Sequence, residues 1–399
     1  MKALSDLVMI DLTHMLAGPF GAMLLADLGA TTIKVEPPGR GEATRRLLEN
    51  DPTHSLNGVG AYFLALNRNK KSVAIDLKLP EGLALFYELA KKADIVFSNF
   101  GPGVNARLGI DHDSLAKHNP RIITCSVSGF GETGPGTNRP AFDMVAQGYG
   151  GGMSITGFPG SPPTKAGIPI GDLGGGIFGV IGVLAALHAR ERSGRGQHVD
   201  ISMQDCQVSL LTYMATMHFL SGQEIGPMGN GHFSHIPYNT YKTKDRHIIL
   251  ACVTDQAWQN VAKVLGDPEL ADPALAALPG RAARREWFEA RLAQALERES
   301  CDHWLARFAE ANVPAAPVND FAHALSDPQI DARNMVVRVP HQDGGEALMP
   351  GNPVKLSETG EESFSSAPRL GQHTDDVLRG LLGKSDAEIA ALRARSIIQ

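Results

Sequence analysis

An aspartate set among glycines and small apolar residues is the feature of this sequence that most directly suggests chemistry. Asp172 follows the short apolar run 168–170 and precedes three consecutive glycines, 174–176. We predict a strand at 168–170 and a helix at 177–189, which places the carboxylate at a strand-to-helix turn that faces a cleft. The neighbouring glycines allow a ligand or another backbone to approach closely. The pattern indicates a nucleophile, and the alternative interpretation is a helix cap, because Asp is a favoured N-cap residue.

Composition restricts the class of protein. The chain has 399 residues, 43% hydrophobic and 20% charged, with a formal net charge of −6. This suits one large or two ordinary globular domains, and it gives no global basic field for nucleic acid or an anionic membrane. The N-terminus lacks the apolar core of a signal peptide, and we expect no long charge-free apolar run later in the chain. We therefore expect a cytoplasmic protein that binds neither nucleic acid nor membrane.

The four cysteines are far apart in the sequence. They show no Cys-x-x-Cys spacing and no His/Cys ligand spacing, so neither a disulfide scaffold nor a metal site is predicted. Buried thiols are the expected state of Cys125, Cys206, Cys252 and Cys301.

The first third of the chain alternates strand-like and helix-like segments. Strands are predicted at 7–11, 31–36, 71–77, 93–100 and 121–127, and helices at 21–28 and 80–92. This order predicts an α/β fold with a doubly wound parallel sheet. The loop 13–19 precedes the first helix and ends in Pro19, which suits a first helical turn. Such a helix start can bind an anion, although a start that binds nothing is the simpler interpretation.

The rest of the chain indicates a second, smaller α/β domain. After a helix, the turn 194–196, a strand at 198–203 and a Met-rich helix, the composition changes to glycine, histidine and proline near 226–233. Further strands are predicted at 241–243, 247–253 and 335–339, and helices at 256–264, 281–297, 302–311, 375–382 and 386–396. We expect the large domain at 1–205, a linker helix at 206–225, the small domain at 226–318, and a return to the large domain at 319–399.

One motif competes with the nucleophile interpretation. Gly174, Gly176 and Gly179 match the dinucleotide-binding fingerprint, and Asp200 follows at about the required distance of ~20 residues. The preceding strand would be very short and interrupted by Pro169. We therefore favour glycines that pack a helix closely, and an NAD-dependent oxidoreductase remains a minor alternative.

Cations near the predicted first domain could bind phosphate. Arg68, Lys70 and Lys71 form a cluster, and the loop 99–103 leads to Arg107, whose guanidinium can bind a phosphate bidentately. Charge runs are more often solvated surface, and that alternative stays open here.

An ordered set of motifs along nearly the whole chain resembles the class III coenzyme A transferases, which include formyl-CoA transferase and the α-methylacyl-CoA racemases. The matching segments are LVMIDL at 7–12, AGP at 17–19, DLGA at 27–30, IKVE at 33–36, NRNKKS at 67–72, NFGPG at 99–103, SGFG at 128–131, GD at 171–172, GRGQ at 194–197 and LGQH at 370–373.

The resemblance implies a nucleophilic aspartate at Asp172. A carboxylate can attack a thioester to give an acyl-aspartyl anhydride and then an aspartyl-CoA thioester, with oxyanions stabilised by glycine amides such as that of Gly175. Asp143 aligns with an acid near the nucleophile that could orient it. No tightly bound cofactor is implied, because coenzyme A and its thioesters are substrates. The resemblance also implies a homodimer of interlocked rings.

The coenzyme site implied by the resemblance lies across the N-terminal domain. Its matching positions are Met15, Leu16, Ala17, Leu66, Asn99, Phe100, Val104, Arg107 and Leu108, with Arg139 as an approximate match to a further cation. Pro37 departs from the pattern, because formyl-CoA transferase carries an arginine there. Arg40, Arg68 or Lys71 could take over that contact.

The substrate implied is a short dicarboxylic acid with succinyl-CoA as donor. Residues 231–232, 236–238 and 241–245 are closest to the succinyl-CoA:dicarboxylate branch. The segment 229–233, with Gly229, Gly231 and His232, resembles a mobile glycine loop over the active site, or is a plain interdomain linker. Candidates to hold the unreacted carboxylate are Arg45, Arg46, His232 and His235.

Three alternative functions remain open at this point. A 2-methylacyl-CoA racemase needs two bases, and the family's racemases place a histidine where this chain has Phe142. The other two alternatives are the NAD-dependent oxidoreductase and a non-catalytic CoA-binding module.

Overall fold

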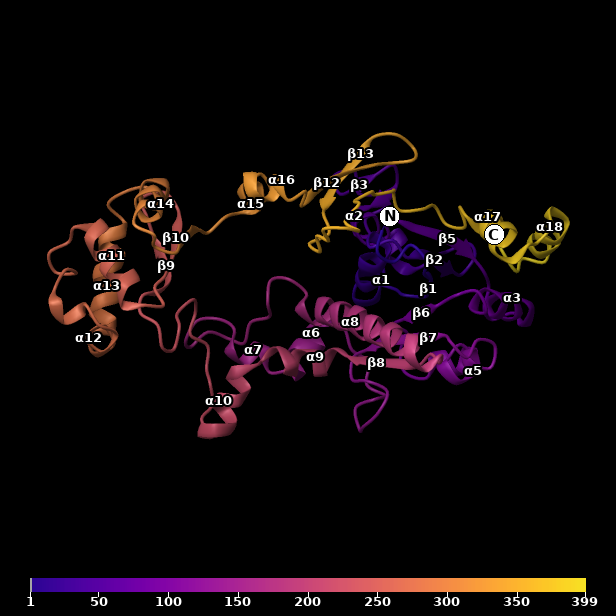
Figure 1. Ribbon diagram of the computed structural model, residues 1–399, viewed down its shortest axis with the longest axis horizontal. Helices are drawn as coiled ribbons and strands as arrows, with labels where there is room; N and C mark the ends of the chain where they lie inside the picture. Colours follow the sequence, from indigo (N-terminus) through magenta and orange to yellow (C-terminus); the bar gives the residue numbers. More distant parts are fainter. Residues whose placement is uncertain (1) are drawn as a thin grey trace. The chain divides into compact units, whose positions relative to one another are not determined.

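A six-stranded parallel sheet forms the centre of the larger unit in the computed structural model, which describes residues 2–399 (Figure 1). The strands lie in the order β5-β2-β1-β6-β7-β8 and every neighbouring pair is parallel. Their bounds are β1 Val8–Asp11, β2 Thr31–Glu36, β5 Lys70–Ala74, β6 Ile95–Ser98, β7 Ile123–Ser128 and β8 His198–Ser202. The predicted α/β fold with a large parallel sheet is confirmed.

Helices cover both faces of this sheet because its strands are apolar on both faces. Met9 and Ile10 of β1 are fully buried in two different core clusters. The Met9 cluster includes side chains of α1 (Ala17–Asp27) and α8 (Ile170–Ser193), and the Ile10 cluster includes side chains of α3 (Pro80–Ala90) and α17 (Thr374–Leu382). Adjacent side chains of a strand point to opposite faces, which accounts for the division.

The strand order reverses between β1 and β6. From β1 the chain continues outward through β2 and β5, whereas from β6 it continues in the other direction through β7 and β8. In open parallel sheets, ligands bind outside the carboxyl ends of the strands at such a point. The loops after Asp11 and after Ser98 therefore mark the place where a ligand is expected.

The prediction of a strand at 168–170 followed by a helix at 177–189 is wrong. Helix α8 already begins at Ile170, so Asp172 lies in its first turn. The glycines that were expected to mark a turn are helical. The close packing of α1 and β7 against this face of α8 leaves little room for a side chain at these positions. A Cβ at Gly176 would lie 2.6 Å from the Ala17 carbonyl oxygen, which explains why glycine occurs in the middle of a helix.

The same helix corrects the expectation that no long apolar run follows the N-terminus. By length and composition α8 could cross a membrane, and it is the one helix among residues 2–399 that could. Buried core helices also pass this test. Here α8 packs against α1, β7, β8 and α9 (Met203–Leu210), and its buried Arg190 forms an ion pair with Asp94 at 3.0 Å.

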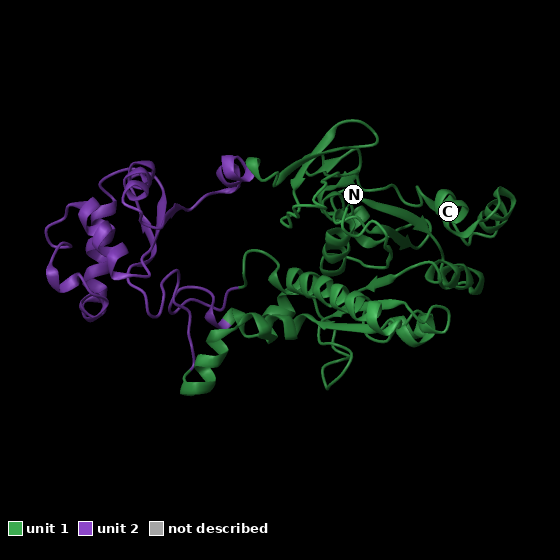
Figure 2. Ribbon diagram, viewed as in Figure 1, with its two compact units in different colours: residues 1–153, 165–223, 331–399 green, residues 154–164, 224–330 purple. Residues whose placement is uncertain are grey.

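The smaller unit consists of residues 154–164 and 224–330, shown in purple in Figure 2. It contains an antiparallel sheet in the order β11-β10-β9, with bounds β11 Ala315–Pro317, β10 His247–Ala251 and β9 Tyr238–Lys242. Helices α11 (Asp255–Leu265), α13 (Arg285–Leu296) and α14 (Cys301–Glu310) bury Trp258, Phe288 and Phe308 in its core.

Several predicted boundaries differ from this division. The segment 154–164 belongs to the smaller unit, and that unit extends to residue 330 where we expected it to end at 318. The expected linker helix at 206–225 is two helices, α9 and α10 (Tyr213–Ser221), separated at Thr212, whose φ is 48°. The expected helix at 281–297 begins at Arg285 and follows a separate short helix, α12 (Leu278–Ala283).

The C-terminal part returns to the larger unit, which comprises residues 1–153, 165–223 and 331–399. It adds the hairpin β12 (Val336–Pro340) and β13 (Glu346–Pro350), then α17 and α18 (Asp386–Ala394). Short elements complete the described chain: η1 Ala43–Arg46, β3 Ser55–Leu56, β4 Val59–Gly60, α2 Ala61–Leu66, α4 Val104–Leu108, α5 His112–Ala116, α6 Asp143–Tyr149, α7 Gly152–Ile155, η2 Pro273–Leu275, α15 Phe321–Leu325 and α16 Pro328–Ala332.

Candidate active site

Two aspartates meet at the start of α8. One oxygen of the Asp143 carboxylate accepts the backbone N–H of Gly171 at 2.8 Å and that of Asp172 at 3.2 Å. The first N–H groups of a helix have no partner within the helix, and a carboxylate there also complements the helix dipole. Asp143 therefore caps α8 from another helix. It accepts a hydrogen bond directly from the backbone N–H of Asp172, the residue predicted to be the nucleophile.

The cap interpretation of Asp172 itself does not fit this geometry. The N-cap residue of α8 is Pro169, and no side chain of its own chain segment caps the helix. Asp172 is only partly buried, and burial followed by the charge of Asp143 raises its pKa to about 6. A carboxyl group with a raised pKa is a stronger nucleophile when ionised and is typical of functional sites.

Tyr62 of α2 is a neighbour of this pair that sequence reasoning missed. Burial, then the charges of Asp172, Glu42 and Asp143, raise the pKa of its phenol to about 12. A phenol with this pKa stays protonated at neutral pH and can donate a hydrogen bond. No sequence signal linked it to Asp172, because the two residues are far apart in the chain.

Gly175 does not have the position that an oxyanion-binding amide needs. It lies beyond the first turn of α8, where backbone N–H groups bond within the helix. A Cβ at this residue would lie 2.9 Å from Val127 and 3.2 Å from Met203. Gly175 therefore serves the close packing of α8 against β7 and α9. This is contrary to the expectation that its amide stabilises an oxyanion.

The loop after β1 is fixed by buried polar contacts. Asp11 accepts the backbone N–H of Thr13 at 2.8 Å, and the Lys34 ammonium donates to the Thr13 carbonyl oxygen at 2.7 Å. The side chain of Asn99, after β6, accepts the His14 N–H at 2.7 Å and donates to the His14 carbonyl at 2.8 Å. Asn99 thus joins the two loops at the point where the strand order reverses.

Most residues predicted to bind the coenzyme lie around these two loops. Met15, Leu16 and Ala17 form the start of α1, and the Phe100 ring contacts the His14 ring edge-on at a centroid distance of 4.7 Å. Val104, Arg107 and Leu108 lie on α4, which follows the Asn99 loop. Leu66 is buried at the end of α2, which packs against α1.

The predicted cations separate into two groups. Arg68 is buried and donates to Asp27 at 2.7 Å and to the Pro350 carbonyl at 2.6 Å, and Lys70 is buried against Asp11 at 2.9 Å. Arg45 donates two 2.6 Å bonds to Glu36. These three residues hold the fold together and are not free to bind phosphate or a substrate carboxylate, contrary to the expectation for Arg68 and Arg45.

The remaining cations are exposed. Lys71 lies on β5, and Arg107 lies in the last turn of α4, where its guanidinium donates to the Pro102 carbonyl oxygen at 3.4 Å. Arg139 lies near the rings of Phe130 and Tyr149, at 5.9 and 5.6 Å. These three side chains keep a charge that a phosphate could use.

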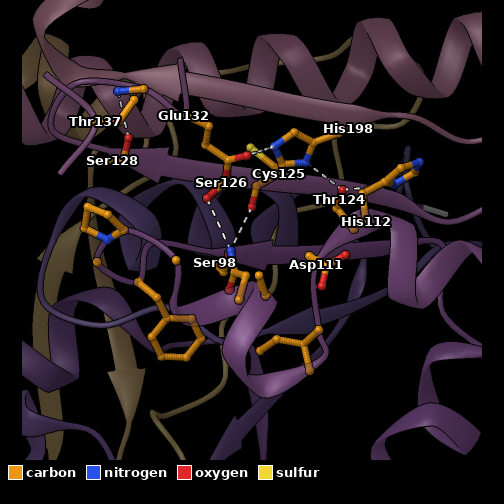
Figure 3. A pocket seen from close by; sticks show the side chains of 18 of the residues that line it. Ser98, Asp111, His112, Thr124, Cys125, Ser126, Ser128, Glu132, Thr137 and His198 are labelled. Atoms are coloured by element: carbon orange, nitrogen blue, oxygen red, sulfur yellow. Dashed lines mark hydrogen bonds and ion pairs between the residues drawn. The ribbon is translucent and has the colours of Figure 1, made fainter. Parts of the chain in front are cut away.

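A cavity of about 450 Å³ opens beside the Asn99–Gly103 loop (Figure 3). Its lining includes Phe100, and it carries a chain of contacts in which the His198 imidazole meets Glu132 at 3.2 Å and Thr124 at 2.8 Å. Thr124 also contacts His112 at 3.1 Å. Neither Asp143 nor Asp172 lines it, and sequence reasoning did not single out its histidines.

The predicted glycine loop lies in the smaller unit. The Gly229 N–H donates to Gly157 at 2.8 Å, and Gly231 donates to Met228 at 3.2 Å. Burial, then His235 and Arg285, lower the pKa of His232, which favours its neutral form. A neutral imidazole can donate a hydrogen bond to a carboxylate but supplies no positive charge.

Possible metal ligands and the cysteines are arranged as follows. Across residues 2–399, no group of three or more His, Cys, Asp or Glu side chains is arranged to hold a metal ion. Cys125, Cys206, Cys252 and Cys301 are buried free thiols, as expected.

Comparison with known proteins identifies the class. The profile of CoA-transferase family III matches residues 4–374. A CaiB/BaiF family protein from Brucella suis has a similar crystal structure, with 36% sequence identity, a TM-score of 0.86, and coverage of 95% of this chain and 99% of that one. The chain belongs to CoA-transferase family III, and it is an enzyme that transfers coenzyme A.

Individual relatives act on several dicarboxylic acids. Acetyl-CoA:oxalate CoA-transferase of Acetobacter aceti is 41% identical and the match covers 88% of each chain. Succinyl-CoA:mesaconate CoA-transferase of Haloarcula marismortui is 37% identical over 95% of this chain and 96% of its own. Succinyl-CoA:glutarate CoA-transferase of Mus musculus is 34% identical over 100% of this chain and 91% of its own.

Proposed function

We propose that this enzyme transfers coenzyme A from succinyl-CoA to a short dicarboxylic acid, with Asp172 as the nucleophile. The observation that carries the proposal is the Asp143–Asp172 pair at the start of α8. Asp143 accepts a hydrogen bond from the backbone N–H of Asp172, whose partly buried carboxyl group has a raised pKa. The names of the relatives support a dicarboxylate as acceptor, because oxalate, mesaconate and glutarate all belong to this class.

In the first half of the reaction, an oxygen of the Asp172 carboxylate attacks the thioester carbon of succinyl-CoA. The carbon–sulfur bond breaks, coenzyme A leaves as the thiolate, and a succinyl-aspartyl anhydride forms. The thiolate then attacks the aspartyl carbon of the anhydride. Succinate leaves as a carboxylate, and the enzyme carries coenzyme A as an aspartyl thioester.

In the second half, the acceptor carboxylate attacks the aspartyl thioester and expels the thiolate again. The thiolate attacks the acceptor's acyl carbon of the resulting anhydride, which releases the new thioester and regenerates Asp172. The four steps balance without gain or loss of a proton. Tyr62 is our candidate donor to the oxyanion that develops at each attack, because its phenol remains protonated beside the two carboxylates.

Coenzyme A is proposed to bind where the strand order of the sheet reverses. The start of α1 offers backbone N–H groups and apolar surface at Met15–Ala17, and Phe100 and α4 provide the neighbouring wall. The exposed cations Lys71, Arg107 and Arg139 are proposed to contact its phosphates. Arg40 remains a further candidate in place of the arginine that Pro37 replaces.

The donor and acceptor are tested by a transfer screen. Succinyl-CoA and acetyl-CoA are each combined with oxalate, mesaconate, glutarate and itaconate, and the new thioester is measured by mass. We expect succinyl-CoA to be the better donor and at least one dicarboxylate to accept. The same preparation is incubated in D2O with a 2-methylacyl-CoA, where we expect no exchange at the α-carbon because Phe142 cannot carry a proton. Rapid exchange without transfer would favour the racemase instead.

We further propose that the protein is an interlocked homodimer that works in the cytoplasm. Within the larger unit, α10 exposes Phe219 and Leu220, with 80% and 84% of their surface accessible. Within the smaller unit, Phe321 is 86% exposed. Large exposed apolar side chains of this kind are typical of surfaces that a partner covers.

A further inference from the structure

Two buried glutamines lie at the turn that carries Asp172 and have no role in the proposed mechanism. Gln147 of α6 is 2% exposed and Gln207 of α9 is 6% exposed. Buried side-chain amides are retained only when their polar atoms are hydrogen-bonded. Each of these glutamines bonds to the segment that carries Asp172, but in a different way.

Gln147 uses both ends of its amide. Its NH2 group donates to the second oxygen of Asp143 at 2.8 Å, and its oxygen accepts the backbone N–H of Ala166 at 2.9 Å. Ala166 therefore fixes which end of the amide faces the carboxylate. A rotated amide would place its oxygen against the carboxylate and its NH2 group against another N–H.

Asp143 consequently receives three hydrogen bonds, from Gly171, Asp172 and Gln147. The three donors bind both oxygens of this carboxylate and so fix its orientation. The Ala166 N–H in turn prevents the Gln147 amide from rotating. The pKa of Asp172, by contrast, is raised to about 6 by burial and then by the charge of Asp143.

We propose that Gln147 is a positioning residue of the transfer site, which fixes the Asp143 carboxylate so that this carboxylate keeps the Asp172 backbone in place while the Asp172 side chain reacts. The inference rests on the proposed function of Asp172 as nucleophile. Its consequence is that Asp143 keeps its hydrogen bond from the Asp172 N–H throughout turnover, while the Asp172 carboxyl group forms and breaks covalent bonds.

Other groups that could titrate near this pair lie on α2 and α9. Tyr62 and Cys206 have pKa values raised to about 12 and about 11, in each case first by burial, so both are neutral between pH 5 and 8. Asp205 of α9 and Glu42 act on these two groups rather than on Asp172. The acid limb of the pH–rate profile in this range is therefore assigned to Asp172, whose pKa is raised to about 6.

The test compares pH–rate profiles of succinyl-CoA-dependent transfer for the wild type and three variants. In Gln147→Met, which keeps the volume but loses both bonds, the Asp143 carboxylate is no longer fixed and Asp172 is no longer held in place. We expect kcat to fall at least about 10-fold and KM for the thioester to change by less than about 2-fold.

Gln147→Glu gives the more specific test, because the new carboxyl group can donate a hydrogen bond to Asp143 only while it is protonated. We expect activity that falls as the pH rises and the new carboxyl ionises, where the wild-type profile stays flat. Gln207→Met is the matched control: its amide donates to the Ile170 carbonyl at 3.1 Å, in the same turn, and no hydrogen bond joins it to Asp143. This variant should lower kcat much less than Gln147→Met does, and its activity should not fall at high pH.

Circular dichroism and thermal unfolding establish that each variant is folded. If Gln147→Met does not fold, the Gln147→Glu profile decides. An unchanged kcat in Gln147→Met, a flat high-pH profile in Gln147→Glu, or an equal fall of kcat in Gln207→Met would overturn the inference while leaving the transferase assignment intact. Absence of any transfer by the wild type would instead contradict the proposed function.

Discussion

Asp143 holds Asp172 through a hydrogen bond from the Asp172 backbone N–H, which leaves the Asp172 carboxyl group available to react. Its folded-state pKa of about 6 lies above its ordinary value of 3.8. The ionised form is the proposed nucleophile, so transfer should rise as the pH increases through about 6 and should be level above pH 7. A pH profile of kcat/KM checks this expectation. Full activity at pH 4.5 would contradict it.

The same shift has a consequence for stability. A carboxyl whose pKa is raised on folding stabilises the fold when protonated, and this contribution is lost as the pH rises from about 4 through about 6. At pH 7.5 the ionised Asp172 therefore costs the fold free energy, which Asp172→Asn removes. We expect this variant to be more stable than the wild type by about 1–2 kcal/mol, after allowance for partial exposure.

Chemical denaturation at pH 7.5 and at pH 4 measures this difference, which should shrink at the lower pH. Phe142→Leu, in the residue next to Asp143, provides a control that changes no charge. Equal stability of Asp172→Asn and wild type at both pH values would show that the ionised Asp172 carboxylate does not destabilise the folded protein.

Some residue assignments were accessible from the sequence and others were not. Gln147 lies four residues after Asp143 on one helix, a spacing at which side chains meet, and it could have been found once a helix at 143–149 was predicted. Arg68 and Arg45 could not have been distinguished from the free cations, because Asp27, at the end of α1, and Glu36, at the end of β2, meet them only in the folded chain.

At the scale of elements, the packing of α1 on α8 brings the expected coenzyme loop and the proposed nucleophile to one place. A Cβ at Gly176 would meet the Ala17 carbonyl at 2.6 Å, whereas a Cβ at Gly174 has no atom nearer than 3.6 Å. We expect Gly176→Ala to destabilise the fold by about 2–3 kcal/mol, and Gly174→Ala to be neutral or slightly stabilising because alanine favours the helix.

Thermal unfolding of the two variants checks this prediction, since they differ by one methyl group at neighbouring positions of one helix. Equal unfolding temperatures would contradict the close packing of α1 and α8. If Gly176→Ala folds, its transfer activity should fall more than its stability loss explains, because the helix starts that carry Ala17 and Asp172 move apart.

The elements of the parallel sheet were largely predictable because buried strands and amphipathic helices alternate regularly. The start of α8 was not, because Ile168 to Ile170 is equally compatible with a strand and with the entry to a helix, and its glycines lower local helix propensity. Tertiary packing against Ala17 and Val127 decides the outcome, and no local pattern encodes those contacts.

At the scale of the whole molecule, the chain forms two units, and both chain ends belong to the larger one. A chain that leaves one unit and returns to it can form a closed loop around a partner. We expect tagged and untagged dimers mixed under native conditions to exchange no subunits over a day, and to exchange after unfolding and refolding. Affinity capture followed by mass analysis measures this, and exchange in the native mixture would contradict the interlocked arrangement.

The most direct test of the account is to find the covalent bond on Asp172. The enzyme is incubated with succinyl-CoA without acceptor, quenched in acid, digested and analysed by mass spectrometry. We predict that the peptide containing Asp172 gains the mass of coenzyme A less one water, and that Asp172→Asn binds coenzyme A but forms no adduct and transfers none. Wild-type transfer without an adduct, together with full activity of Asp172→Asn in a preparation free of deamidation, would contradict the account.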